Sequence, residues 1–301
     1  MIELAWGVII AWYLFLAGLS AGAYLTASFT ARKYPDKKVL RLAGRYAAPV
    51  LIGVGLILLI FDAEAGLHHP LRFIYLLTNP TSVMTIGTYL ISVFMMASLA
   101  VAALEFFKRK VPAFLEWTGI IFAVGTAVYT GFLIGVVGNV PLWNTAILPV
   151  LFAVSATSTG MAVTMLIAAF FDRQAVHSVL AVKKIHLGLL VTEVVLLFTM
   201  FYITSSTSEV ARESVSAILS GEYSLLFWIG LMVIGLLFPI TIEILELANH
   251  NKMTHSPAGL QAAAAGKGGI IGTVAAESGV LIGGFILRFL VLAAALPATF
   301  L

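Results

Sequence analysis

The chain has 301 residues, of which 61% are hydrophobic and only 10% are charged, and its mean hydropathy is +1.06. These values exclude an ordinary water-soluble domain and indicate an integral membrane protein. The formal net charge of +3 comes from basic residues in the loops, so it does not indicate a nucleic-acid partner. The absence of cysteine excludes iron–sulfur ligation, CxxCH haem attachment and disulfides in this chain.

Eight apolar runs of about 20 residues are long enough to cross a bilayer as helices. They cover roughly residues 6–29, 44–61, 83–107, 114–137, 146–170, 185–203, 223–247 and 270–296. The short alternating segments of a transmembrane barrel are absent from the sequence. We therefore predict an all-α integral membrane protein with eight transmembrane helices. The first run lacks the basic start of a signal peptide and is expected to be retained.

The basic residues predict the orientation of the helices. Fourteen of the 17 lie in the connections after the first, third, fifth and seventh predicted helices, whereas the connections on the other side hold only Arg72 and Arg212. Because cytoplasmic loops collect Lys and Arg, both termini are predicted to lie on the outer, extracytoplasmic side.

A weak internal repeat relates LFLAGLSAG at residues 14–22 to LFAVSATSTG at residues 151–160. Both segments lie in helices predicted to run inward, so the repeat would be parallel. It predicts two four-helix bundles, comprising residues 1–137 and 138–301. Closely packed helices would show similar small residues without any repeat.

Six ionisable residues of the second half are predicted to lie inside the spans, where charges are costly and are candidates for function. From the cytoplasmic side outward they are Glu246, Glu243, Glu277, His186, Glu193 and Arg288. We predict that they form a proton route. The alternative is that Arg288 pairs with Glu193 only to neutralise two buried charges, while Glu246 reaches to the surface.

Three tyrosines in the first half have a similar predicted depth. At about 1.5 Å per residue, Tyr13, Tyr89 and Tyr129 lie about 10–12 Å below the outer ends of their helices. A pocket at that depth, capped by the polar stretch 61–80, would suit a flat apolar molecule that needs hydrogen bonds at a carbonyl oxygen, such as a quinone. The alternative is that the tyrosines belong to an interfacial aromatic belt.

The stretch FDAEAGLHHPLRFIYLLTNP at residues 61–80 contains adjacent histidines, His68 and His69. Adjacent histidines on a helix point about 100° apart, and no third nitrogen ligand is near, so we predict no metal site there. Haem b is not expected either, because His186 is the only histidine within a predicted span. The stretch is predicted to form a polar lid, with Asp62, His68 and Arg72 as its catalytic candidates.

Four segments of the sequence together resemble the NrfD/PsrC family, the membrane subunits of polysulfide-reductase and nitrite-reductase type respiratory complexes. They are WGVIIAWYLFLAGLSAGAYL, FDAEAGLHHPLRFIYLLTNPTSVMTIGTYL, IHLGLLVTEVVLLF and GVLIGGFILRFLVL. The resemblance implies a multi-pass anchor in the cytoplasmic (inner) membrane that exchanges electrons with quinone, menaquinone being expected. The implied partners are an extracytoplasmic ferredoxin-like iron–sulfur subunit and a catalytic subunit, either a molybdopterin enzyme or a multihaem cytochrome.

The resemblance also implies roles for single residues. Tyr129 matches the tyrosine that contacts quinone, and Tyr13 stands where some members have histidine, which leaves the partner of the quinone carbonyl open. The residues that match the family's loop are Asp62, Arg72 and Asn79. Glu193 and Arg288 match positions in the second half of family members for which a role in proton transfer is proposed.

Two other functions remain open. A secondary transporter would also show a four-plus-four parallel repeat, acids within the membrane, and Pro239 following Gly235. A purely structural anchor would assemble a complex without binding quinone. Solute flux without redox partners would indicate the first, and an intact complex without quinone binding would indicate the second.

Overall fold

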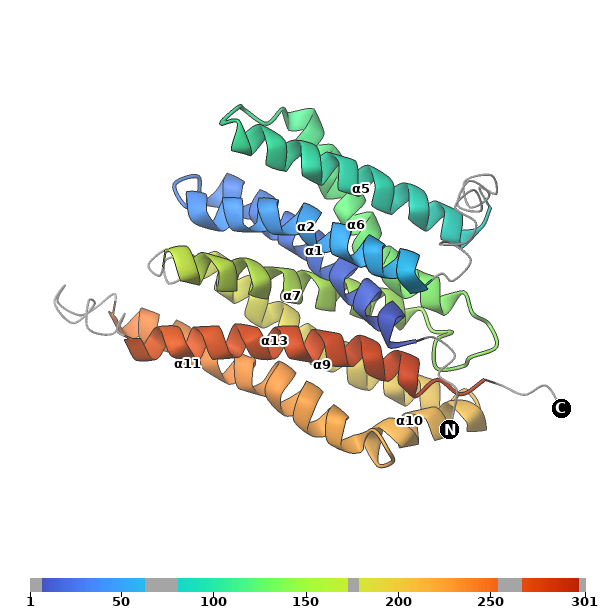
Figure 1. Ribbon diagram of the computed structural model, residues 1–301. Helices are drawn as coiled ribbons and strands as arrows, with labels where there is room; N and C mark the ends of the chain where they lie inside the picture. Colours follow the sequence, from blue (N-terminus) through green and yellow to red (C-terminus); the bar gives the residue numbers. More distant parts are fainter. Residues whose placement is uncertain (1–6, 63–80, 173–178, 254–266, 298–301) are drawn as a thin grey trace.

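A computed structural model describes residues 7–62, 81–172, 179–253 and 267–297. These residues form helices and no strand, and the long helices lie roughly alongside one another (Figure 1). In chain order the helices are α1 (Val8–Lys33), α2 (Lys38–Asp62), α5 (Val83–Phe106), α6 (Ala113–Gly135), α7 (Ile147–Phe171), α9 (Leu180–Ser205), α10 (Glu209–Leu219), η1 (Leu226–Leu237), α11 (Phe238–Met253) and α13 (Lys267–Ala293).

The prediction of eight spans is confirmed. Eight helical stretches within the described ranges are long and apolar enough to cross a membrane, with η1 and α11 joined into one stretch, Leu226–Ala248. Three helices begin at least three residues earlier than predicted: α2 at Lys38, α9 at Leu180 and α13 at Lys267, against predicted starts at residues 44, 185 and 270. Their first turns carry basic residues, which come shortly before the apolar runs in the sequence and were therefore left out of the predicted helices.

The first and last spans place the two ends of the protein on one side. The start of α1 and the end of α13 lie at the same end of the helices (Figure 1), as an even number of spans requires. The short helix α10 lies at that end too, and the Ser208 hydroxyl caps it by accepting a hydrogen bond from the Ala211 amide at 3.2 Å. That this end faces outward stays a prediction from the basic loops.

Helices α1 and α7 cross with their backbones in contact. A Cβ atom on Gly22 would lie 1.9 Å from the Ala156 carbonyl oxygen, and one on Gly160 would lie 2.1 Å from the Gly22 carbonyl carbon. Only glycine fits either position, as expected where small residues let membrane helices approach closely. The contact joins the two segments of the proposed repeat, while the division into two four-helix bundles stays a prediction.

The seventh span begins as a wide helix with i→i+5 hydrogen bonds, η1, and continues as the ordinary helix α11. Such wide helices are rare, and the sequence did not predict this one. Close contacts with α13 accompany it, since a Cβ atom on Gly235 would lie 2.5 Å from the Gly283 Cα atom. The change to α11 occurs at Pro239, which has no amide hydrogen to donate.

We expect Gly22→Ala to destabilise the protein by about 2 kcal/mol or more, because the new methyl group meets the α7 backbone, which cannot move aside as a flexible side chain would. Thermal unfolding of the purified protein in detergent measures the effect. Gly188→Ala is the matched control, since a Cβ atom on this α9 glycine would have nothing within 4 Å. Equal unfolding temperatures for the two variants would contradict the α1–α7 contact.

Candidate functional site

Two of the three predicted tyrosines are buried in the interior. Tyr13 on α1 is 2% exposed and Tyr129 on α6 is 6% exposed, and both belong to one apolar core. The two phenols are close enough to influence each other electrostatically. Their predicted contact with quinone stays a prediction.

Tyr129 lies against a glycine that was not predicted from the sequence to matter. A Cβ atom on Gly87 of α5 would lie 1.7 Å from Tyr129 Cζ, so the tyrosine ring fills the space beside this glycine. Tyr89, two residues further along α5, is 44% exposed. It therefore lies on a different face of α5 from Gly87, and its predicted place in the quinone site stays a prediction.

The proposed polar lid lies outside the described residues. Asp62 is the last residue of α2, but its side chain is not among those described. The other lid candidates outside the described residues are His68, Arg72 and Asn79. Their predicted roles stay predictions.

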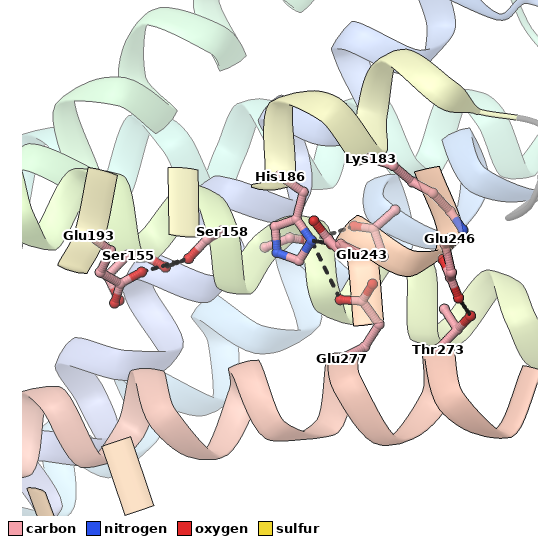
Figure 2. Close-up of polar contacts among 11 residues, drawn as sticks. Ser155, Ser158, Lys183, His186, Glu193, Glu243, Glu246, Thr273 and Glu277 are labelled. Carbon is pink, nitrogen blue, oxygen red and sulfur yellow. Dashed lines mark hydrogen bonds and ion pairs between the residues drawn. The ribbon is translucent and has the colours of Figure 1, made fainter. Parts of the chain in front are cut away.

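Three ionisable side chains of the second half converge from three helices (Figure 2). His186 of α9 lies with its Nδ1 atom 2.5 Å from Glu243 Oε1 of α11 and 3.8 Å from Glu277 Oε2 of α13. All three side chains are buried. The second carboxylate oxygen of Glu243 and the Nε2 atom of His186 have no hydrogen-bond partner among the described residues.

This cluster has the residue types of a metal site, but the His186 nitrogen and the Glu243 oxygen are separated by a hydrogen-bond distance. One ligand atom from each residue lies within 4.8 Å of the others. Two ligands about 2.1 Å from one tetrahedral ion are about 3.4 Å apart, however, whereas His186 and Glu243 are at hydrogen-bond distance. One imidazolium can balance only one of the two carboxylates, so the cluster carries a net negative charge when all three groups are ionised.

The polar contacts continue from this cluster toward the end of the helices that carries the basic loops. Lys183 of α9 forms an ion pair with Glu246 of α11, and Thr273 of α13 donates a hydrogen bond to Glu246 Oε1 at 2.5 Å (Figure 2). The side chain of Glu246 is only 18% exposed. Glu246 is therefore paired inside the helix bundle rather than extended to the surface.

Contacts also continue in the opposite direction. The Ser158 hydroxyl donates to Glu193 Oε2 at 3.0 Å. Arg288 Nη1 donates to Ser155 Oγ at 3.2 Å and to the Gly284 carbonyl at 2.7 Å. Ser155 also lies close enough to Glu193 to affect its carboxylate, so Arg288 and Glu193 share this serine as a neighbour. No hydrogen bond among the described residues joins this group to His186, whose Nε2 atom has no partner there.

The side chain of Arg288 extends from α13 toward α1 and α7. The rings of Phe15 and Phe152 flank its guanidinium, with centroids 5.7 and 5.2 Å from Cζ. A Cβ atom on Gly18 would lie 2.9 Å from Arg288 Nη2, so this α1 glycine leaves room for the guanidinium. Helix α1 therefore contributes both to the tyrosine pair and to the surroundings of Arg288.

Several members of this series of contacts were not predicted from the sequence. Ser155 and Ser158 lie in the segment LFAVSATSTG, which was noted only for its possible repeat. Lys183 was counted only as a basic loop residue, although its side chain is 6% exposed. The three-residue spacing of the serines, which places them on one helix face, was the available signal.

These features define a class: a multi-pass membrane protein with ionisable groups inside its spans, which includes quinone-handling anchors and ion-coupled carriers. A family model described as "Polysulphide reductase, NrfD" matches residues 2–298. The chain belongs to the NrfD family, and the family resemblance predicted from its sequence is confirmed.

Three relatives illustrate the match. A protein of Wolinella succinogenes that is named as one of the chains of polysulfide reductase is 33% identical over 273 residues, covering 79% of the present sequence and 83% of that protein. Protein NrfD from Escherichia coli is 30% identical over 274 residues, covering 80% and 85%. A protein of Mesobacillus selenatarsenatis that is named as a subunit of selenate reductase is 25% identical over 310 residues, covering 85% and 70%.

We expect Lys183→Met to lower stability by about 2 kcal/mol, because it leaves the mostly buried Glu246 carboxylate without its cation. The double variant Lys183→Met, Glu246→Gln should recover most of this loss, and Lys184→Met, at the exposed neighbouring lysine, should have little effect. Thermal unfolding of all three variants measures the coupling. A double variant no more stable than Lys183→Met would argue against the pair.

Proposed function

We propose that this protein is the membrane subunit through which an oxidoreductase complex exchanges electrons with the quinone pool, menaquinol being the expected quinol. The observation that carries the proposal is the buried Tyr13–Tyr129 pair in a member of the NrfD family. Relatives named as parts of polysulfide and selenate reductases support a catalytic partner for this protein.

The chemistry of the tyrosine pair fits a quinone head group. A phenol hydroxyl donates to a quinone carbonyl and accepts from a quinol hydroxyl, so Tyr13 and Tyr129 are suited to either redox form. The apolar core around them suits the ring. A bound quinol would supply two electrons and two protons. In this proposal Asp62 or His68 accepts a proton, while Arg72 and Asn79 belong to the lid.

The electron acceptor has to reside on a partner. The sequence has no cysteine, so it lacks the usual ligand of an iron–sulfur cluster. We propose a ferredoxin-like iron–sulfur subunit at the end where α1 begins, followed by a catalytic subunit, either a molybdopterin enzyme or a multihaem cytochrome. The complex would lie in the cytoplasmic membrane with these subunits outside.

We further propose that the buried contacts of the second half carry protons. They form separate hydrogen-bonded groups that follow one another along the helices: Thr273 with Glu246, His186 with Glu243, Ser158 with Glu193 (Figure 2), and Ser155 with Arg288. Histidine and carboxylate groups at hydrogen-bond distance exchange protons readily, and His186 has a second ring nitrogen with no hydrogen-bond partner in the described part of the protein. This arrangement favours proton movement coupled to quinol oxidation.

We expect Tyr129→Phe to slow quinol oxidation about tenfold, because it removes one hydrogen bond to the quinone oxygen. Gly87→Ala should have a similar effect by displacing the Tyr129 ring. The readout is the rate at which reduced menaquinone analogue bleaches the iron–sulfur absorption of the purified complex. Tyr202→Phe, at a tyrosine that is 77% exposed, and Gly53→Ala, whose nearest neighbour is an ordinary contact at 3.5 Å, are the matched controls.

Normal turnover in Tyr129→Phe would contradict the assignment of this tyrosine. A complex that assembles but neither binds nor oxidises quinol would favour the purely structural anchor. A colourless, partner-free protein that moves solute in liposomes would favour the transporter instead.

For the proton route we expect His186→Gln and Glu277→Gln to lower the number of protons moved across the membrane per quinol oxidised by at least half. Both changes remove a titratable group from the buried cluster while keeping a similar volume. A pH-sensitive dye in proteoliposomes that hold the complete complex measures the ratio. Glu209→Gln, at the exposed start of α10, is the control, and an unchanged ratio in both cluster variants would exclude the route.

A further inference from the structure

A second site lies at the other end of the first four spans, where α1 meets α2 and α5 meets α6. It is a pocket of about 790 Å³, within the range of about 300–1,000 Å³ common for ligand sites. Six basic side chains line it: Lys38, Arg41, Arg45, Lys108, Arg109 and Lys110. The proposed quinone and proton functions use none of them.

Only part of this positive charge is balanced within the pocket. Arg41 Nε lies 3.3 Å from Glu105 Oε1, while Arg45 contacts Glu105 and also Glu116, with Nη2 3.0 Å from Glu116 Oε1. These are the acids among the described residues that line the pocket, and the two arginines match them. The Nε donor of Arg45, a side chain that is 5% exposed, has no hydrogen-bond partner among the described residues.

The remaining cations are held close together by the backbone. Lys108, Arg109 and Lys110 follow one another in the turn between α5 and α6, and Lys38 begins α2 beside them. Lys108 has a φ of 53°, the left-handed region that residues other than glycine seldom adopt. Neighbouring positive charges repel one another, so an anion bound among these basic side chains would stabilise the pocket.

The rim of the pocket is apolar and faces outward from the helices. Tyr46 and Phe106 line the pocket and are 37% and 71% exposed. At the end of a membrane span, exposed aromatic residues lie at the level of the headgroups and upper acyl chains. The pocket therefore offers cations for a negative group and an apolar surface for hydrocarbon directly beside it.

We propose that this pocket binds the phosphate headgroup of an anionic phospholipid whose acyl chains lie against Tyr46 and Phe106. Basic pockets between spans on the cytoplasmic side commonly bind such headgroups, and this end carries the basic loops. Free phosphate is also negatively charged, but it has no acyl chains to pack against Tyr46 and Phe106. The site is independent of the proposed quinone function, because the tyrosine pair belongs to the opposite halves of the same helices.

Lipid binding to the purified full-length protein tests the proposal, with phosphatidylglycerol as probe and phosphatidylcholine, a zwitterionic lipid without net charge, as the comparison. We expect Arg109→Gln, Lys110→Gln to weaken phosphatidylglycerol binding about tenfold, since each basic residue near an anionic headgroup contributes. The matched control, Lys33→Gln, Lys184→Gln, removes two exposed charges from the same end outside the pocket and should change binding less than twofold. Equal weakening in both variants would overturn the site.

Two further measurements remain decisive if a variant fails to fold. Wild-type protein reconstituted in vesicles with equal parts of the two lipids and then extracted in detergent should retain phosphatidylglycerol in several-fold excess by mass spectrometry. Equal retention would overturn the proposal. Displacement of the lipid by millimolar inorganic phosphate would show that the pocket takes the free ion and would overturn the lipid assignment.

Discussion

The backbone contact between α1 and α7 is the constraint on which both halves of the protein depend. In a membrane, helices associate through close packing rather than through the hydrophobic effect, so the absence of side chains at Gly22 and Gly160 fixes where α1 lies. That placement points Tyr13 toward Tyr129 of α6 and Phe15 toward Arg288 of α13. A single helix thus supports the proposed quinone site and one end of the proposed proton route.

The buried charges of the second half show how such groups are tolerated without water. Lys183 has Glu246, and Arg288 has hydroxyl and carbonyl acceptors and two aromatic faces. A protonated His186 can balance one carboxylate of the Glu243–Glu277 pair, and the three groups lie close to one another. The proposed proton route depends on this closeness.

From the sequence, the position of a residue along its helix was predicted better than the side of the helix on which it lies. Length and apolarity identified all eight spans, but the first turns of α2, α9 and α13 were missed because basic residues interrupt the apolar runs. Tyr89 and Tyr129 have similar predicted depths, yet only Tyr129 is buried, since direction depends on how neighbouring helices pack. Gly87 and η1 could not be predicted for the same reason: both depend on contacts between helices distant in sequence.

The packing also bears on the choice between a redox anchor and an alternating-access carrier. A carrier built from two halves has to rock one half against the other, which requires an interface that slides or separates. Here α1 and α7 meet through backbone atoms at Gly22, Ala156 and Gly160, and Arg288 of α13 is enclosed by Phe15 and Phe152 of these same helices. If the two predicted bundles were the moving parts, rocking would break these contacts and leave a buried guanidinium without its surroundings. The proposed electron exchange and proton movement do not require these helices to separate.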